Sequence, residues 1–315
     1  APATAGAIAR LALGLADDYL GAVALATAAP LVVAPAMEHH MLHHPAVRDH
    51  LATLERRGAT IVPPGHGRLA SGAIGDGRLA PTEAIVGAIR ATLGRQGSLA
   101  GRTVVVTAGG THEPIDPVRF VGNRSSGQMG YALAEEARDR GASVILVSGP
   151  TALADPFGID VRRVETAEQM LQAVAAATAA ADALVMAAAV ADFRPETAAE
   201  QKLKKLPGET TRSLVLVRNP DILASVVRDG LITVGFAAET EDLEANAAAK
   251  LRAKSLAMIV ANEATATIGA PTSRAVILWP DRAPERLPPM PKEALAAIVV
   301  DRLHALLAAE SERDA

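Results

Sequence analysis

The feature that most constrains the fold is a strand–helix–strand pattern between Gly101 and Pro150. Val104 to Val106 forms a β-branched run flanked by glycines, and Val144 to Val147 forms a second apolar run. Between the two runs, apolar side chains recur at helical spacing, at Met129, Ala132, Leu133 and Ala137. Short apolar runs on either side of an amphipathic helix are typical of buried parallel strands. The chain is therefore predicted to build an α/β domain around a parallel sheet.

The loop between the first strand and the helix is unusually long. It runs for roughly fifteen residues, where a few residues are usual. Loops of this kind lie at the carboxyl edge of a parallel sheet, where ligands bind. The loop ends in Ser125-Ser126-Gly127, which we expect to cap the helix. The free backbone N–H groups at such a helix start suit a phosphate.

A dinucleotide-dependent oxidoreductase is the first alternative for a strand–loop–helix unit. Gly109 and Gly110 are not followed by a third glycine at the spacing of the dinucleotide fingerprint. The second strand ends in Ser148 and Gly149 rather than in the acidic residue that would bind a ribose. The sequence thus disfavours NAD(P), and a lack of NAD(P)H binding would exclude this alternative.

The loop carries a long and specific motif. From Gly109 to Gly130 it reads Gly-Gly-Thr-x-Glu-Pro-Ile-Asp-Pro-Val-Arg-Phe-x-x-Asn-x-Ser-Ser-Gly-x-Met-Gly. This motif resembles the signature of the bifunctional coenzyme A biosynthesis family, in which a flavin-dependent phosphopantothenoylcysteine decarboxylase precedes a phosphopantothenate–cysteine ligase. The resemblance implies two Rossmann-like parallel-sheet domains in the α/β class. Residues 1–95 would be the carboxyl-terminal part of a flavodoxin-like flavoprotein domain that is truncated at its N-terminus, and residues 99–315 the ligase domain, with a linker at Gly94 to Ser98.

The first segment resembles the decarboxylase but departs from it at functional positions. Ser71 stands where the family has the cysteine that donates a proton to the enethiolate intermediate, and Glu38 stands where it has an asparagine. A serine hydroxyl is a far weaker acid than a thiol, whose pKa is about 8.5. The negative charge of Glu38 would oppose binding of the substrate carboxylate. We therefore expect an altered decarboxylase, in which Ser71 holds the catalytic position and FMN is the family's cofactor, serving mainly as an oligomerisation scaffold.

A histidine cluster follows Glu38. His39, His40 and His43 could suggest a metal site, but only Glu38 is close enough in sequence to complete a ligand set. Clustered surface histidines are the preferred interpretation, and no metal ligand is assigned.

The ligase segment carries further motifs of the family. The resemblance implies that CTP, the co-substrate, contacts Ser125, Met186, Ala187, Ala188, Asp192, Lys202, Pro220, Asp221, Ile222, Leu223, Phe236, Lys250 and Lys254. The residues alone allow plainer interpretations. Asp192 would be a helix N-cap, Asp221 or Asn219 would cap the next helix, and Lys250 and Lys254, four residues apart, would share a solvated helix face.

The resemblance also implies the reaction. The carboxylate of 4′-phosphopantothenate attacks the α-phosphate of CTP, giving an acyl cytidylate and pyrophosphate, and the amine of L-cysteine then displaces CMP. Lys202, on a mobile basic loop, would stabilise the phosphates, and Arg119 and Asn123 would hold the acyl intermediate. Mg²⁺ would neutralise phosphate charge. A non-catalytic nucleotide-binding module is the main rival, but decay should not spare Arg119, Asn123 and Lys202 together.

Composition limits the other functions. The net charge of −4 argues against a nucleic-acid partner, and the absence of cysteine excludes disulfides and thiolate metal sites. The longest apolar run, Ala173 to Ala191, is interrupted by Thr178 and Asp182, so we expect no membrane span, and no signal peptide is visible. We therefore expect a cytoplasmic enzyme of small-molecule substrates, and the family implies a homo-oligomer. The sequence leaves open whether CTP or another nucleotide is preferred.

Overall fold

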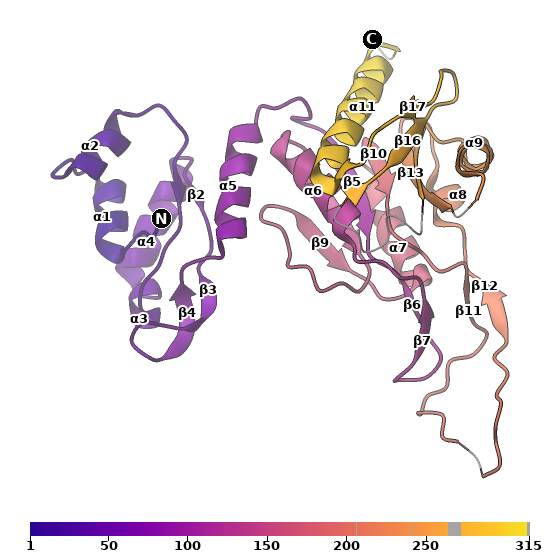
Figure 1. Cartoon of the computed structure of the whole chain (residues 1–315). Helices are drawn as coiled ribbons and strands as arrows, with labels where there is room; N and C mark the ends of the chain where they lie inside the picture. Colours follow the sequence, from indigo (N-terminus) through magenta and orange to yellow (C-terminus); the bar gives the residue numbers. More distant parts are fainter. Residues whose placement is uncertain (206, 240, 264–271, 314–315) are drawn as a thin grey trace. The chain divides into compact units, whose positions relative to one another are not determined.

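The computed structural model describes residues 1–205, 207–239, 241–263 and 272–313. The chain divides into two units (Figure 1). One comprises Ala1–Gly97 with Pro156–Gly158, and the other comprises Ser98–Asp155 with Ile159–Ala315.

The first unit is a small α/β arrangement. Its elements are α1 (Ala5–Leu13), α2 (Tyr19–Ala26), β1 (Val32–Val33), α3 (His39–Leu42), α4 (Pro45–Arg56), β2 (Thr60–Ile61), β3 (Gly65–Arg68), β4 (Ile74–Arg78) and α5 (Thr82–Gly94). Strands β1 and β2 are parallel, as the alternation of strands and helices predicted. Ile8, Val33 and Leu54 from α1, β1 and α4 are buried together in one hydrophobic cluster of this unit, and Ala34, Val62, Ala80 and Ala88 form another.

The glycine-rich composition of Ser71 to Arg78 predicts a loop, but the segment is a loop only at its start. Residues Ile74–Arg78 form β4, which pairs in antiparallel fashion with β3. Composition does not reveal this hairpin, because it is held by backbone pairing and has few side chains that show a strand period.

The second unit is built on an eight-stranded sheet. Its strands are β5 (Thr103–Ala108), β8 (Ser143–Ser148), β9 (Asp160–Arg163), β10 (Ala183–Met186), β13 (Ile232–Glu239), β14 (Met258–Glu263), β16 (Ala275–Leu278) and β17 (Glu285–Arg286). Their order in the sheet is β17-β16-β14-β13-β10-β5-β8-β9. The six strands from β14 to β9 are parallel, and β16 and β17 extend the sheet in antiparallel fashion. In chain order the six parallel strands run 3-2-1-4-5-6, which is the doubly wound arrangement.

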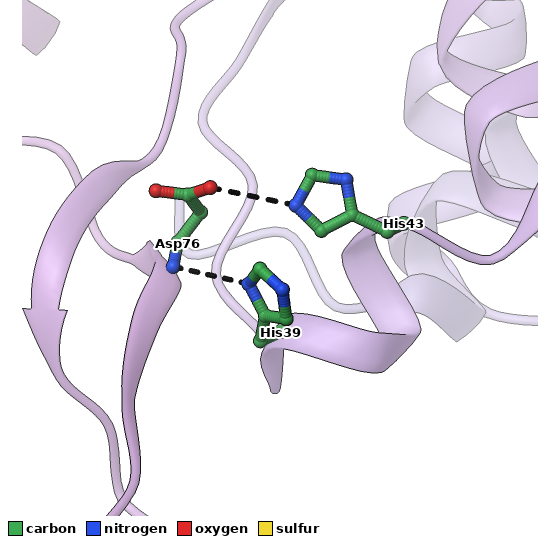
Figure 2. Close-up of side chains that lie close together, drawn as sticks. All are labelled: His39, His43 and Asp76. Carbon is green, nitrogen blue, oxygen red and sulfur yellow. Dashed lines mark hydrogen bonds and ion pairs between the residues drawn. The ribbon is translucent and has the colours of Figure 1, made fainter.

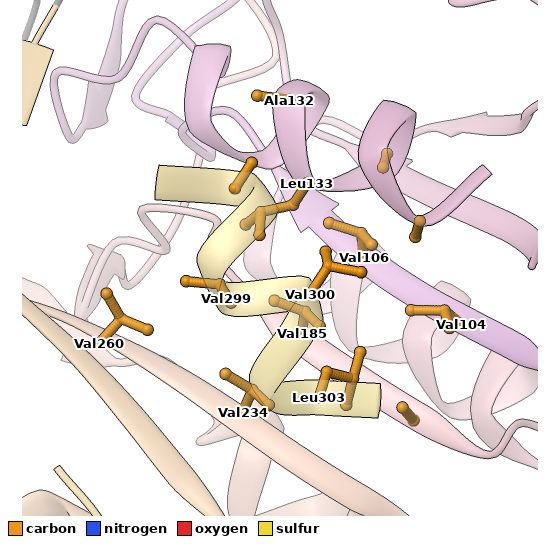
Figure 3. Close-up of a cluster of buried hydrophobic side chains, with 14 of the residues drawn as sticks. Val104, Val106, Ala132, Leu133, Val185, Val234, Val260, Val299, Val300 and Leu303 are labelled. Atoms are coloured by element: carbon orange, nitrogen blue, oxygen red, sulfur yellow. The ribbon is translucent and has the colours of Figure 1, made fainter. Parts of the chain in front are cut away.

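Helices cover both faces of this sheet because successive strand residues point to opposite sides. Val104 and Val106 belong to one core and Val105 to the other. The first core is covered by α6 (Gln128–Asp139) and α11 (Lys292–Arg313), which contribute Leu133 and Leu303 (Figure 3). The second is covered by α7 (Ala167–Thr178), α8 (Ile222–Val226) and α9 (Leu243–Ala253). The α/β class predicted from the sequence is confirmed.

Among the described residues of the second unit, three small antiparallel ribbons lie outside the main sheet. They are β6 (His112–Pro114) with β7 (Phe120–Gly122), β11 (Phe193–Pro195) with β12 (Leu216–Arg218), and β15 (Thr272–Ser273) with β18 (Met290–Pro291). The first is the long loop of the sequence analysis, which folds into a hairpin. Figure 1 shows that β6–β7 and β11–β12 both extend away from the eight-stranded sheet.

Candidate functional site

A cleft lies at the carboxyl edge of the parallel sheet, at the ends of β10, β13 and β14. It consists of two adjoining hollows of ≈ 660 Å³ and ≈ 1390 Å³. Both are lined by Ala188, Val190, Asp192, Phe236 and Lys250, so the two hollows form one continuous site. This is the position at which doubly wound sheets bind ligands.

The first hollow is built around the start of α8. Asp221 is the N-cap of this helix, and its carboxylate accepts a hydrogen bond from the backbone N–H of Ala224 at 3.2 Å. Lys254 Nζ lies 3.0 Å from both carboxylate oxygens of Asp221. Desolvation opposes ionisation of Asp221, but the hydrogen bonds from Lys254 and Ala224 outweigh it and lower its pKa. The capping role predicted for Asp221 is confirmed, and the cap also anchors a cation at the cleft.

Lys250 lies one helical turn before Lys254 and points into both hollows. Its Nζ donates to the carbonyl oxygen of Phe236 at 3.1 Å. Burial, and secondarily the positive charge of Lys254, lower the pKa of Lys250 below its usual 10.5. The plain interpretation of a solvated helix face was therefore wrong for this pair, because α9 packs this face toward the sheet edge. Two partly buried ammonium groups side by side favour an anionic ligand.

Asn219 lies just before α8 and bonds to the segment that follows β10. Its side-chain amide donates to the carbonyl of Ala191 at 2.8 Å, and its backbone N–H donates to the carbonyl of Asp192 at 2.8 Å. The segment after β10 is thereby tied to the start of α8. Asp192 precedes β11 rather than a helix, so the predicted helix-cap alternative was wrong. Its exposed side chain borders both hollows.

The second hollow is built around the start of α6. The N-cap of this helix is Gly127, with φ of 76°, and it provides no side-chain cap. Ser125 does not cap the helix as predicted; instead its hydroxyl oxygen accepts from the backbone N–H of Gly127 at 3.3 Å. The positive φ makes glycine the favoured residue at this corner. The first N–H groups of α6 therefore remain without a side-chain cap where the helix borders the cleft.

Asn123 holds the long loop after β5 against the segment that follows β10. Its side-chain amide donates to the carbonyl oxygen of Val190 at 3.0 Å, and it lines the second hollow. Gly130 allows α6 to approach β5, because a Cβ at this position would lie 2.5 Å from the Cβ of Ala108. The walls of the cleft are thus fixed by contacts between β5, α6 and the exit of β10.

Residues that sequence reasoning missed complete the second hollow. Lys292, at the start of α11, is buried, and its Nζ donates to Oε1 of Gln128 at 3.1 Å. Desolvation lowers the pKa of Lys292. The hydroxyl of Ser273 is buried and, among the residues described, has no hydrogen-bond partner. A lysine in the first turn of a helix opposes the helix dipole, and this was the one sequence signal that could have identified Lys292.

Arg119 and Lys202 do not line either hollow of their own chain. The structure nevertheless brings their segments together through the buried carboxylate of Asp116. One oxygen of Asp116 accepts from Nη1 of Arg119 at 3.1 Å and from the backbone N–H of Leu203 at 3.1 Å. Arg119 also donates to the carbonyl of Leu203 at 3.2 Å. Lys202 itself is exposed on this segment.

Apart from Arg119, Lys202 and Ser71, the site residues predicted from the sequence line the two hollows. The first hollow is lined by Met186, Ala188, Asp192, Pro220, Asp221, Ile222, Leu223, Phe236, Lys250 and Lys254, and the second by Asn123, Ser125 and Ala187. Ser71 belongs to the other unit, where it lies exposed in the turn between β3 and β4.

The fold and the cleft define a class: a doubly wound α/β protein with a lysine-lined cleft at the switch point of its sheet. Two family descriptions match the sequence. "DNA/pantothenate metabolism flavoprotein C-terminal domain" matches residues 99–307, and "Flavoprotein" matches residues 1–94. The chain belongs to the family of the coenzyme A biosynthesis bifunctional proteins.

Similar proteins and structures agree with this assignment. The coenzyme A biosynthesis bifunctional protein CoaBC of Mycobacterium tuberculosis (strain ATCC 25618 / H37Rv) is 49% identical over 280 residues, which cover 83% of this chain and 66% of that protein. The chain thus spans about two thirds of that relative's length. The CoaBC protein of Bacillus subtilis (strain 168) is 43% identical over 321 residues, covering 99% of this chain and 79% of the relative. A crystal structure of the C-terminal domain of a CoaBC protein is 38% identical, with a TM-score of 0.58, and covers 67% of this chain and 98% of that structure.

Among the residues that the structure describes, no helix has the length and apolar character needed to cross a membrane.

Proposed function

We propose that the chain catalyses the CTP-dependent ligation of 4′-phosphopantothenate with L-cysteine, with release of pyrophosphate and CMP. The observation that carries this proposal is the pair Lys250 and Lys254 beside the capped start of α8, in a cleft that also receives the start of α6. The names of the relatives, which assign them to coenzyme A biosynthesis, give the substrate class. A cytoplasmic location follows from these substrates.

The chemistry needs an activated acyl group because a carboxylate is a poor electrophile. Attack of the phosphopantothenate carboxylate on the α-phosphate of CTP forms a P–O bond and breaks the bond to pyrophosphate. The cysteine amine then forms the amide bond, and CMP leaves with the electron pair of the acyl–oxygen bond. Cations and backbone N–H groups in the cleft, from Lys250, Lys254 and the start of α6, stabilise the charge that develops on the phosphates.

A magnesium ion fits the donor set of the cleft. Asp192 borders both hollows and Glu239 borders the second. Mg²⁺ is usually held by one or two carboxylates together with substrate phosphates and water, and such an ion would neutralise phosphate charge. Asp192 and Glu239 are the residues that would hold it.

Asn123 and Arg119 are assigned to the acyl cytidylate. Asn123 lies in the second hollow, where its amide can orient a carbonyl oxygen. Arg119 and Lys202 lie together outside the cleft lining, which means that their segment has to move or that another copy has to supply them. A loop that delivers Lys202 after both substrates have bound would keep water from the acyl phosphate.

We also propose that the ligase unit forms a homodimer. The two ribbons beside the site expose large apolar side chains: Val118, Phe120, Phe193, Leu214, Val215 and Leu216 are 41–62% exposed. Exposed large apolar side chains gathered on two neighbouring ribbons favour a protein interface. A second copy of the chain is the occupant, and the molecular mass from light scattering after size-exclusion chromatography tests it. A monomer at micromolar concentration would contradict the proposal.

The experiment that tests the ligase is pyrophosphate release from CTP. The purified chain is assayed with phosphopantothenate, with and without cysteine, beside Lys202→Gln and the matched control Lys204→Gln. Release that requires phosphopantothenate and is lost in Lys202→Gln, but kept in Lys204→Gln, supports the activation step and its lysine. CTP binding without release from the parent chain would instead identify a non-catalytic nucleotide-binding module.

For the first unit we propose an altered decarboxylase domain with Ser71 at the proton-donating position. The match of residues 1–94 to the flavoprotein family supports FMN as the family's cofactor. Ser71 lies in an exposed turn, and Glu38 caps α3 through a hydrogen bond from the backbone N–H of His40 at 2.7 Å. We expect this domain to have lost decarboxylase activity; a flavin spectrum of the purified protein together with carbon dioxide release from phosphopantothenoylcysteine would overturn this expectation.

A further inference from the structure

The first unit contains a histidine–carboxylate cluster that the ligase reaction does not use. His39 lies in α3 and His43 directly follows it, and both face Asp76 in β4 (Figure 2). One possible ligand atom from each of these three residues lies within 4.8 Å of the other two. Sequence reasoning paired the histidines with Glu38, but that carboxylate is occupied as the cap of α3. The carboxylate that completes the cluster comes from a strand more than thirty residues away.

We propose that His39, His43 and Asp76 bind a divalent first-row transition-metal ion of the Zn²⁺ type. Two imidazole nitrogens and one carboxylate oxygen are the ligands that Zn²⁺ prefers, whereas Mg²⁺ and Ca²⁺ prefer oxygen ligands alone. Three protein ligands leave a fourth position for water or for a small ligand. His39 and His43 have the i, i+4 spacing that places two imidazoles on one helix face.

The distance between His43 and Asp76 agrees with this geometry. Nε2 of His43 lies 3.4 Å from Oδ2 of Asp76. Tetrahedral zinc with bonds of roughly 2.0–2.1 Å separates two of its ligands by about 3.3 Å. Nδ1 of His39 accepts a hydrogen bond from the backbone N–H of Asp76 at 3.2 Å, so this nitrogen carries a lone pair rather than a proton. A metal ion would take that lone pair in exchange for a long hydrogen bond.

A fourth residue supports the carboxylate from the other side. Nδ1 of His66, in β3, lies 2.9 Å from Oδ1 of Asp76, which leaves Oδ2 turned toward His43. Metal-binding carboxylates are usually held by such outer hydrogen bonds. His66 therefore acts as a positioning residue for Asp76.

Two glycines allow the β3–β4 hairpin to lie close to α3 and to the residues before it. A Cβ on Gly75 would lie 3.1 Å from the ring of His39, and a Cβ on Gly77 would lie 2.1 Å from the carbonyl oxygen of Met37. The backbone N–H of Met37 also donates to the carbonyl of Gly77 at 2.9 Å. The ligands therefore lie on elements that are already packed together, so little ordering is needed on binding.

The test is titration of the metal-free 315-residue chain with Zn²⁺ by calorimetry and with Co²⁺ by visible absorption. We expect one ion per chain at this site, with the intense ligand-field bands of four-coordinate Co²⁺. Asp76→Asn and His43→Gln should each weaken binding by at least about 10-fold, since loss of even an outer partner costs 10- to 100-fold. Circular dichroism of each variant confirms that it is folded.

The matched control is His40→Gln, which removes the neighbouring exposed histidine of α3. We expect its affinity to equal that of the parent. Equal losses in His40→Gln and His43→Gln would overturn the proposal, because they would identify chelation by surface histidines. Absence of Zn²⁺ and Co²⁺ binding, or binding unchanged in Asp76→Asn, would overturn it as well.

Discussion

Replacing Lys250 by methionine should separate nucleotide binding from stability. Burial and the nearby Lys254 lower the pKa of Lys250, which means that its charged form is less favourable in the folded chain than in water. Methionine keeps a similar unbranched stem and removes the ammonium group. We therefore expect Lys250→Met to leave the free energy of unfolding unchanged or to raise it, while affinity for CTP falls.

The size of the loss follows from the kind of contact. The ammonium group of Lys250 donates one hydrogen bond to the carbonyl of Phe236 at 3.1 Å, and a lysine ammonium has two further N–H bonds that can reach a phosphate. A hydrogen bond to a charged group contributes about 1.5–3 kcal/mol. Since 1.4 kcal/mol corresponds to tenfold, the dissociation constant for CTP should rise about 10- to 150-fold.

The pH dependence has a defined sign. Below its lowered folded-state pKa, Lys250 is protonated in both states and its desolvation destabilises the folded chain in full. Between that pKa and 10.5 the unfolded chain binds more protons, so the stability of the parent relative to Lys250→Met should rise with pH. CTP affinity of the parent should fall across the same window, because the phosphate contact needs the protonated amine.

Lys254→Met is the matched control for this experiment. Its ammonium group is paired with Asp221, and both side chains are partly exposed, so its loss should cost no more than about 1 kcal/mol of stability. Calorimetric titration with CTP and urea unfolding on all three proteins give the comparison. The reasoning is refuted if Lys250→Met binds CTP as tightly as the parent, or if its free energy of unfolding falls below that of the parent.

Three further predictions concern the cleft and the segment that carries Lys202. Gly130→Ala should cost about 1–3 kcal/mol, because its Cβ would lie 2.5 Å from that of Ala108; calorimetry should show a lower Tm, and an unchanged Tm would contradict the close approach. Lys292→Met should weaken binding of an anionic substrate roughly 10-fold without unfolding, measured by separate titrations with CTP and phosphopantothenate, and unaltered affinity for both would exclude it from the site. Asp116→Ala should release the segment that carries Lys202 and speed its cleavage by trypsin, whereas equal cleavage rates would show that Asp116 does not hold that segment.

The sequence predicted the parts of the fold that side-chain periodicity encodes. Strands β5 and β8 are continuous apolar runs, and a run buried on both faces has to lie inside a sheet covered by helices. The β3–β4 hairpin and the β6–β7 ribbon were not predicted. Their pairing is made by the backbone, and their glycine, proline and charged residues carry no strand period.

The site residues also divide into those that local sequence patterns reveal and those that only the fold brings together. Spacing placed Lys250 and Lys254 on one helix face, but spacing does not tell which face of a short helix is buried, and here the lysine face borders the cleft. Lys292 and Ser273 reach the second hollow from the last part of the chain, through β15 and the start of α11. No local pattern joins them to the motif of the long loop. Only the way the sheet is extended beyond β14 brings them to its carboxyl edge.

Asp116 links the segments of Arg119 and Lys202, which both lie outside the cleft. Burial alone would raise the pKa of Asp116. Hydrogen bonds from the backbone N–H groups of Val118, Leu203 and Arg119 outweigh burial, so the pKa of Asp116 is lowered. The carboxylate therefore stays ionised down to pH values below 3.8, and the link to Leu203 should fail only as pH falls through that lowered pKa. At neutral pH the turn that carries Arg119 and the segment that carries Lys202 are joined by this carboxylate and by the hydrogen bond from Arg119 to the carbonyl of Leu203. A movement that delivers one of these cations to bound phosphates should therefore deliver the other.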